Sequence, residues 1–156
     1  MASQNSTLRA AQVAADTTRN ADTTIKSYQA PIRYAIFDIT LTTAVASNDD
    51  IILGKLGCAG TVIPELSRAV GISGGAAGSF TLEKVNAAGT VAALTGAAAI
   101  TTDGTSVAFA RKSGFALGTF DEADYLQVTF TEASGGAINA TDVLQFMVAY
   151  IAPDLP

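Results

Sequence analysis

Apolar and polar side chains alternate through most of the chain after residue 31, in short runs that end at turn residues. Within residues 33–43, Phe37, Ile39 and Leu41 fall on one face of an extended strand, and an aspartate and two threonines fall on the other. A period of two in aromatic and β-branched residues is typical of a half-buried β-strand. We therefore expect a strand here, with those three apolar residues facing a core.

Further strands are expected wherever a similar run lies between turn signals. These runs are residues 51–56, 61–72, 79–85, 106–111, 125–131 and 142–151. Within residues 61–72, Pro64 lacks the N–H that a strand donates to its neighbour, which predicts an edge strand or a β-bulge. Residues 91–100 have the alanine content of a helix, but Gly96 and the adjoining turns favour a small-residue strand or a loop.

The recurrence of seven or eight such runs at short intervals predicts an all-β domain. Long helical patterns are missing, which disfavours architectures that alternate strands and helices. An antiparallel jelly roll, a β-sandwich of about eight strands, is the first expectation for residues 33–156. An immunoglobulin-like sandwich is the second, although that fold usually carries a Trp and a Cys pair, and this chain has no Trp and one Cys.

Residues 1–32 differ from the rest because they are polar, rich in Ala and poor in large apolar side chains. We expect an N-terminal arm, extended or partly helical; a helix over residues 8–15 would be marginal in water without a partner. Residues 1–33 carry 4 basic and 2 acidic groups, a net charge of +2, whereas residues 34–156 carry 5 basic and 12 acidic groups, a net charge of −7. An arm that gains order on a partner fits this split; a flexible tail without a role is the alternative.

The composition argues against an enzyme. The chain has no His, which removes the commonest general base and metal ligand, so Cys58 has no His to activate it as a nucleophile. The acidic residues of the predicted turns are Asp49, Asp50, Asp103, Asp121, Glu122 and Asp124. Loop oxygens of this kind can bind calcium, but a turn-forming role is sufficient to explain them. The glycine-rich residues 71–78 lack the Lys and Ser/Thr of a phosphate-binding loop. We expect no catalytic residues, no metal and no cofactor.

Charged residues make up 15% of the chain, fewer than the surface of a free monomer usually carries. Part of the surface is therefore expected to be covered by copies of the chain or by a larger body; a compact extracellular β domain rich in surface Thr and Ala is the alternative. The net charge of −5 disfavours nucleic acid as a partner. No run of about 20 apolar residues predicts a membrane span. The N-terminus lacks a secretory pattern, so synthesis in a cytoplasm and use without signal-directed export are expected.

Six segments together give a resemblance to a known family. They are residues 36–41, 50–56, 60–66, 70–72, 124–130 and 143–150. In their strand pattern they resemble the small jelly-roll decoration, or cement, proteins of tailed-bacteriophage heads. The resemblance implies a homotrimer that binds the major capsid protein on the outer capsid surface of the virion and stabilises the shell, often with the help of extended terminal arms.

The residues expected to contact the capsid lie in the arm or directly after it, and they are Arg9, Arg19, Lys26, Tyr28 and Arg33. The expectation follows from net charge, since a basic arm suits an acidic shell. Two alternatives stay open. One is a carbohydrate-binding jelly-roll module, for which the candidate sugar platforms are Tyr28, Tyr34, Tyr125 and Tyr150. The other is a different structural component of a virion, such as a tail, fibre or coat part.

Overall fold

The computed structural model describes residues 32–71, 78–100, 106–113, 117–132, 138–139 and 142–152. The strands in this part of the chain are β1 (Ile32–Thr40), β2 (Asp50–Gly54), β3 (Gly60–Val62), β4 (Arg68–Gly71), β5 (Gly78–Val85), β6 (Val91–Ile100), β7 (Ser106–Ala108), β8 (Thr119–Phe120), β9 (Tyr125–Glu132) and β10 (Val143–Ile151). One turn of 3-10 helix, η1 (Pro64–Leu66), lies between β3 and β4. Residues 1–31 of the expected arm, residues 72–77 of the glycine-rich loop and Asp103 lie outside the described residues.

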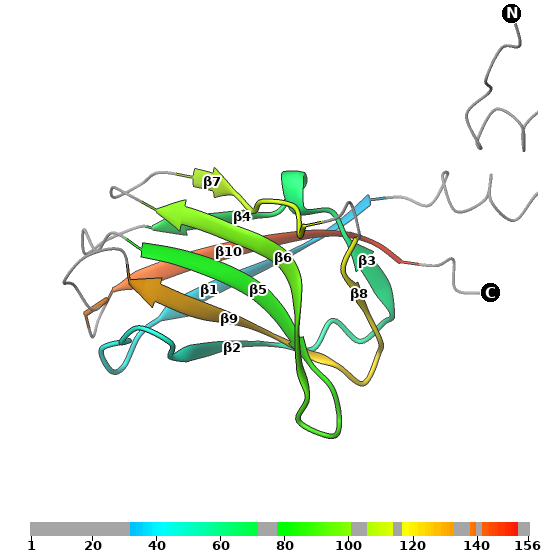
Figure 1. Ribbon diagram of the computed structural model, residues 1–156, viewed down its shortest axis with the longest axis horizontal. Coiled ribbons are helices and arrows are strands. Elements are labelled where there is room, and N and C mark those ends of the chain that lie inside the picture. The colour runs from blue at the N-terminus through cyan, green and yellow to red at the C-terminus, as the bar shows by residue number, and fades with distance from the viewer. Residues whose placement is uncertain are drawn as a thin grey trace, which may run out of the picture. The chain divides into compact units, whose positions relative to one another are not determined.

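The strands pair as a long hairpin folded over on itself. β1 pairs with β10, β2 with β9, β4 with β7 and β5 with β6, all antiparallel, so that each pair is nested in sequence inside the one before. The strands form two sheets, one containing β1, β10, β4 and β7 and the other ordered β2-β9-β5-β6, while β3 and β8 extend the first sheet. Figure 1 shows the two layers, with the second sheet in front. This nested order is that of a jelly roll, so the expected fold class is confirmed and the immunoglobulin-like alternative is not the fold adopted.

The predicted single strand over residues 61–72 is wrong, because Pro64 divides it. Pro64 begins η1, and the chain on either side forms β3 and β4, which both pair with β10. The Ser67 hydroxyl bridges the break: it donates to the Ile63 carbonyl at 2.9 Å and accepts the Ala149 N–H at 2.9 Å. Of the two alternatives predicted for this strand, the edge position is wrong, since β8 pairs with the far side of β3 and β7 with the far side of β4. The irregularity predicted at Pro64 is present, as a turn of 3-10 helix in place of a β-bulge.

One side of the sandwich is closed where β6 meets the chain after β7. The Gly96 N–H donates to the Ala110 carbonyl at 2.7 Å. A Cβ on residue 96 would lie 2.8 Å from the Arg111 carbonyl oxygen, so glycine allows the two segments to approach this closely. Residues 91–100, ambiguous in the sequence, therefore form a strand. The opposite side is open: within the described residues, β1 and β2 each pair with one neighbour.

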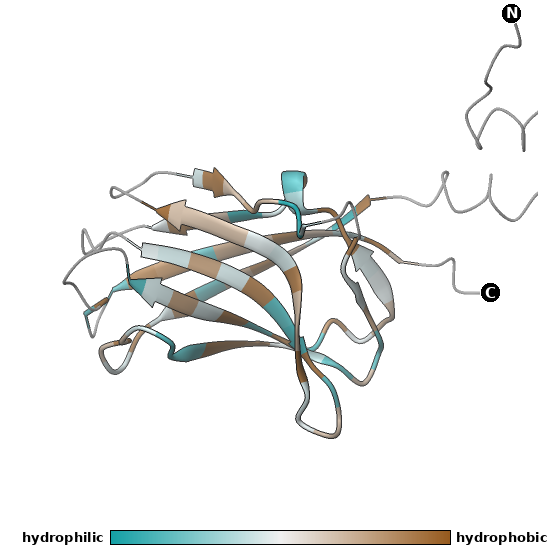
Figure 2. Cartoon of the chain, in the orientation of Figure 1, coloured by the Kyte–Doolittle hydropathy of each residue, from teal (hydrophilic) through white to brown (hydrophobic). Residues whose placement is uncertain are grey.

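The core lies between the two sheets and is filled by the inward positions of the strands. Phe80 and Phe130 of one sheet meet Phe146 of the other; ring centroids are 5.3 Å apart for Phe80 and Phe130 and 5.1 Å apart for Phe80 and Phe146. Figure 2 shows the matching alternation of hydropathy along β5 and β9. On β1, Phe37 and Ile39 pack against this core and are partly buried, as the sequence predicts.

Candidate partner-binding surface

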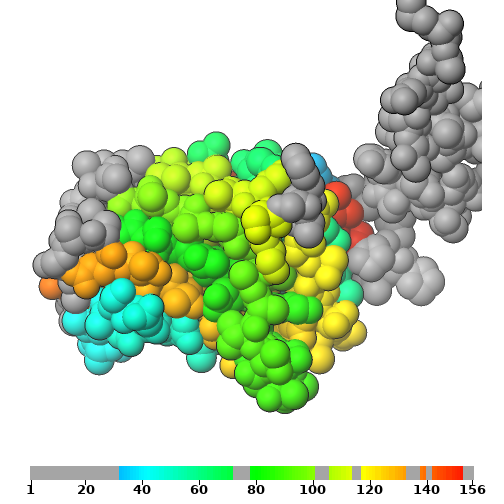
Figure 3. Space-filling model, viewed as in Figure 1, coloured from blue at the N-terminus to red at the C-terminus, as the bar shows by residue number. Residues whose placement is uncertain are grey.

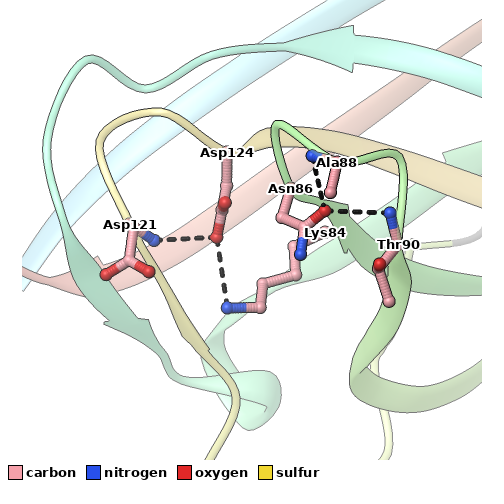
Figure 4. A network of polar contacts seen from close by, with 6 residues as sticks. All are labelled: Lys84, Asn86, Ala88, Thr90, Asp121 and Asp124. Atoms are coloured by element: carbon pink, nitrogen blue, oxygen red, sulfur yellow. Dashed lines mark hydrogen bonds and ion pairs between the residues drawn. The ribbon is translucent and has the colours of Figure 1, made fainter.

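The acidic turn before β9 is organised around one ion pair. Asp124, 4% exposed, accepts the Asp121 N–H at 2.9 Å and lies 3.1 Å from the Lys84 ammonium nitrogen (Figure 4). The Asp121 hydrogen bond, and then Lys84, lower the pKa of the Asp124 carboxyl against burial, which raises it. Asp124 is thus matched by a cation of the chain itself. Across the described residues, no three His, Cys, Asp or Glu side chains are grouped as metal ligands would be.

Beside this turn, the β5–β6 hairpin is closed by a side-chain amide. The Asn86 Oδ1 accepts the Ala88 N–H at 3.0 Å and the Thr90 N–H at 2.9 Å (Figure 4). Gly89 has a φ of +79°, the left-handed conformation that glycine adopts without steric penalty. These contacts satisfy backbone donors of the turn. The polar residues at this end of the sandwich therefore hold loops in shape.

Cys58 lies beside the buried side chain of Tyr150. The thiol is free and half-buried, and Tyr150 on β10 is 8% exposed. Burial, and then the contact with Cys58, raise the pKa of the Tyr150 hydroxyl. A thiol beside a buried phenol provides no general base that would activate either group as a nucleophile.

The outer face of the β2-β9-β5-β6 sheet is covered by small and polar side chains. Thr81 on β5 lies opposite Thr129 on β9, and Ser79 lies opposite Thr131, with alanines on the outer positions of the adjoining β6. The Thr129 hydroxyl lies 2.6 Å from an Asp50 carboxylate oxygen and 2.7 Å from a Glu83 carboxylate oxygen. Figure 3 shows these strands side by side on the front of the body. On this face β2 adds one large exposed apolar side chain, Ile52, which is 66% exposed and in register with Gln127 on β9. Ile52 is surrounded by polar side chains and does not form part of an apolar row.

The outer face of the other sheet is different, because a row of large apolar side chains runs along β1. Ile32 is 44% exposed, Tyr34 is 53% exposed and Ile36 is 60% exposed. We call these three residues the apolar row. In register with them on β10, and on the same face, lie Ile151, Ala149 and Met147. The row ends at Asp38, whose carboxylate accepts a hydrogen bond from Gln145 Nε2 at 2.7 Å, so that an apolar centre borders a polar rim.

The two strands on the open side of the sandwich are unequally protected. β2 has five residues, has a register shift against β9 between Ile52 and Gly54, and is followed by the exposed Lys55. β1 has nine residues, all in unbroken register with β10, and contains neither lysine nor proline. Short, bulged or lysine-flanked edges resist pairing with other chains, whereas long regular edges invite it. The apolar row thus lies on the less protected edge.

Of the residues predicted to contact the capsid, the structure places one. Arg33 is the second residue of β1, is exposed and lies opposite Tyr150 on β10. Arg9, Arg19, Lys26 and Tyr28 lie outside the described residues. The sequence analysis missed the apolar row next to Arg33. The signal was present, since residues 34–37 are apolar at both parities of the strand, which marks a strand with two covered faces.

Comparisons with protein families, with curated proteins and with solved structures find no match to this chain. The resemblance to decoration proteins therefore rests on the strand pattern alone. Within the described residues, no helix is long and apolar enough to span a membrane. Among the tyrosines considered as sugar platforms, Tyr34 is exposed, Tyr125 is half-buried and Tyr150 is buried, while Tyr28 lies outside the described residues.

Proposed function

We propose that this chain is a non-enzymatic structural protein of a virus particle: a decoration, or cement, protein that binds the outer surface of a tailed-bacteriophage head as a homotrimer and stabilises the shell. Its partners are the major capsid protein and further copies of itself. The observation that supports this most is the contrast between the two outer faces of the jelly roll. One is small and polar apart from the single isoleucine Ile52, and the other carries the apolar row, three large apolar side chains in succession, on an open edge.

A cement protein needs a rigid body and surfaces that other subunits cover. Two sheets packed over a phenylalanine core supply the rigidity. The apolar face supplies a surface for association, and the polar face suits contact with water. In this proposal the arm, residues 1–32, extends onto the shell and contacts it together with Arg33, while the acidic body, net −7 over residues 34–156, stays away from acidic surroundings.

A carbohydrate-binding role is less well supported. Sugar platforms are exposed aromatic rings, and within the described residues Tyr34 is the one candidate that is more than half exposed. Tyr34 lies in the middle of the apolar row, between two isoleucines, where a protein partner explains it better than a sugar. Another structural role in a virion shares the same surface chemistry and is separated from decoration by the number of copies per particle.

Attachment to shells tests the proposal. Purified chain is mixed with heads that lack it, taken from the virus whose genome encodes it, and the heads are sedimented. We expect saturable binding and greater resistance of the heads to heat. A chain lacking residues 1–30 should bind more weakly while its β body keeps the same circular dichroism spectrum. The matched control is Lys112→Ala, which removes an exposed cation of the body that lies outside β1 and β10 and should leave binding unchanged. Heads that neither bind the chain nor gain stability would contradict the proposal.

A further inference from the structure

The apolar row on the open edge strand β1 is the surface of the described residues best suited to contact another protein chain. We propose that the apolar row is the contact between copies of this chain; in the homotrimer of the proposed function, the rows of three copies would meet at the threefold axis. This inference deepens the proposed function: it rests on the claim that copies associate and not on attachment to a shell. Extended over residues 32–36, each row is about 13 Å long, enough to form one continuous apolar core along the axis.

A partner for the apolar row has to be available as soon as each chain folds. A long, regular edge strand with exposed apolar side chains pairs with whatever strand it meets, and proteins that leave such an edge bare aggregate. A partner that arrives later, such as a sugar or a finished shell, leaves the edge bare in the meantime. β2, on the same open side, has a bulge and a neighbouring Lys55 as protection. β1 has neither, and its two exposed charges, Arg33 and Asp38, leave Tyr34 and Ile36 between them uncovered. We therefore infer that the cover comes from the chain itself or from another copy.

The residues before β1 are a poor cover for the row. Residues 1–31 contain few large apolar side chains, namely Leu8, Val13, Ile25 and Tyr28, and their spacings never give the period of two that would oppose a β-strand. A second copy offers what is missing, because its own row carries apolar side chains at three successive outward positions. The same surface on each copy is therefore the better match.

The border of the patch is that of an interface, and its apolar area forms the central part of one. At roughly half exposure each, the three side chains of the row present on the order of 300 Å² per copy, less than the ~800 Å² per partner of a standard interface. Met147 and Ile151, half-buried on β10 and in register with Ile36 and Ile32, extend the apolar surface on the same face. Asp38, hydrogen-bonded to Gln145, provides the polar rim that borders interface cores.

The molar mass of the purified full-length chain tests this inference directly. We expect a trimer by light scattering after size exclusion. Ile36→Lys should place three like charges on the axis and raise the dissociation constant by about 100-fold, giving monomers at micromolar concentration. The matched control is Ile52→Lys, which charges a similarly exposed isoleucine (66%) on β2 and should leave the trimer intact. A wild-type monomer, a trimeric Ile36→Lys variant, or equal dissociation of both variants overturns the inference.

A second measurement keeps the test sound if Ile36→Lys fails to fold. In a Cys58→Ser background, Ile36→Cys should form disulfide-linked dimers on mild oxidation, and Ile52→Cys should not; the reverse pattern overturns the inference. Removing residues 1–30 should leave the row-dependent trimer in place, and loss of association in that chain would assign the contact to the N-terminal residues instead. A trimer that fails to bind heads refutes only the proposed function, and head binding by a monomer refutes only the inference.

Discussion

Replacing Asp124 by asparagine tests the polar architecture of the body most sharply. The carboxylate accepts the Asp121 N–H at 2.9 Å, lies 3.1 Å from the Lys84 ammonium and is 4% exposed. Asparagine keeps an oxygen for the N–H but removes the charge that Lys84 faces. Breaking a fully buried pair costs about 3–5 kcal/mol, and a charged hydrogen bond contributes about 1.5–3 kcal/mol. Because the Lys84 side chain is 23% exposed and can rehydrate, we expect a loss of about 2 kcal/mol.

Urea unfolding at two pH values measures the effect. At pH 7 the variant should unfold with a free energy lower by that amount, which corresponds to a Tm lower by about 8 °C for a body of this size. The pKa of Asp124 is lowered in the folded state, below the value of about 3.9 expected for the unfolded chain. The stabilisation is therefore complete above about pH 5 and is lost as pH falls through the folded pKa, so the difference between wild type and variant should shrink steadily as the pH is lowered below about 4.

The control is Asp121→Asn, which removes an exposed carboxylate from the same turn and keeps the backbone N–H that Asp124 accepts. It should change the free energy of unfolding by less than about 0.5 kcal/mol. Equal stabilities of wild type and Asp124→Asn at pH 7, or a difference that persists unchanged at pH 2, would refute the role assigned to this ion pair.

Three further substitutions probe the core and the turns. Phe146→Ala should lower the free energy of unfolding by about 3–5 kcal/mol in urea, because the ring is fully buried and its centroid lies 5.1 Å from that of Phe80; a loss under 1 kcal/mol contradicts the core described above. Gly78→Ala should cost about 1–3 kcal/mol by thermal melting, since the added Cβ would overlap the Phe130 ring, and an unchanged Tm argues against that close approach. Asn86→Ala removes the acceptor of the Thr90 N–H and should cost about 1 kcal/mol; faster hydrogen exchange at that amide reports the loss, and unchanged exchange contradicts it.

The sequence predicts most of the individual strands because their inward positions carry large apolar side chains. Residues 79–85, 125–131 and 142–151 all coincide with strands to within a residue or two. The division at Pro64 could not be predicted, because the Ser67 hydroxyl that bridges it contacts Ala149, 82 residues away. The nested strand order has the same origin: alternation is local to each strand and contains no information about which strands pair.

The candidate surface was predicted only in part. Arg33 was singled out for its charge, and the structure places it on β1 between Ile32 and Tyr34, but at the opposite parity of the strand from the apolar row. The row itself was missed because a period of two assigns one face of a strand to the core and treats the other face as solvent. Ile32, Tyr34 and Ile36 break that rule, since they are apolar on the outer face. Exposed apolar side chains in a contiguous patch are typical of surfaces that associate with another molecule, which is the basis of the proposal made for this row.

The number of copies of this chain in a purified virus particle tests the proposed function most directly. Particles produced from the genome that encodes the chain are purified through a density gradient, and the chain and the major capsid protein are quantified by mass spectrometry. A decoration protein should be present at a copy number that approaches that of the shell subunit and should be removable without opening the heads. A chain that is absent from the particles, or present in only a few copies at a tail or fibre, would contradict its assignment to the capsid surface.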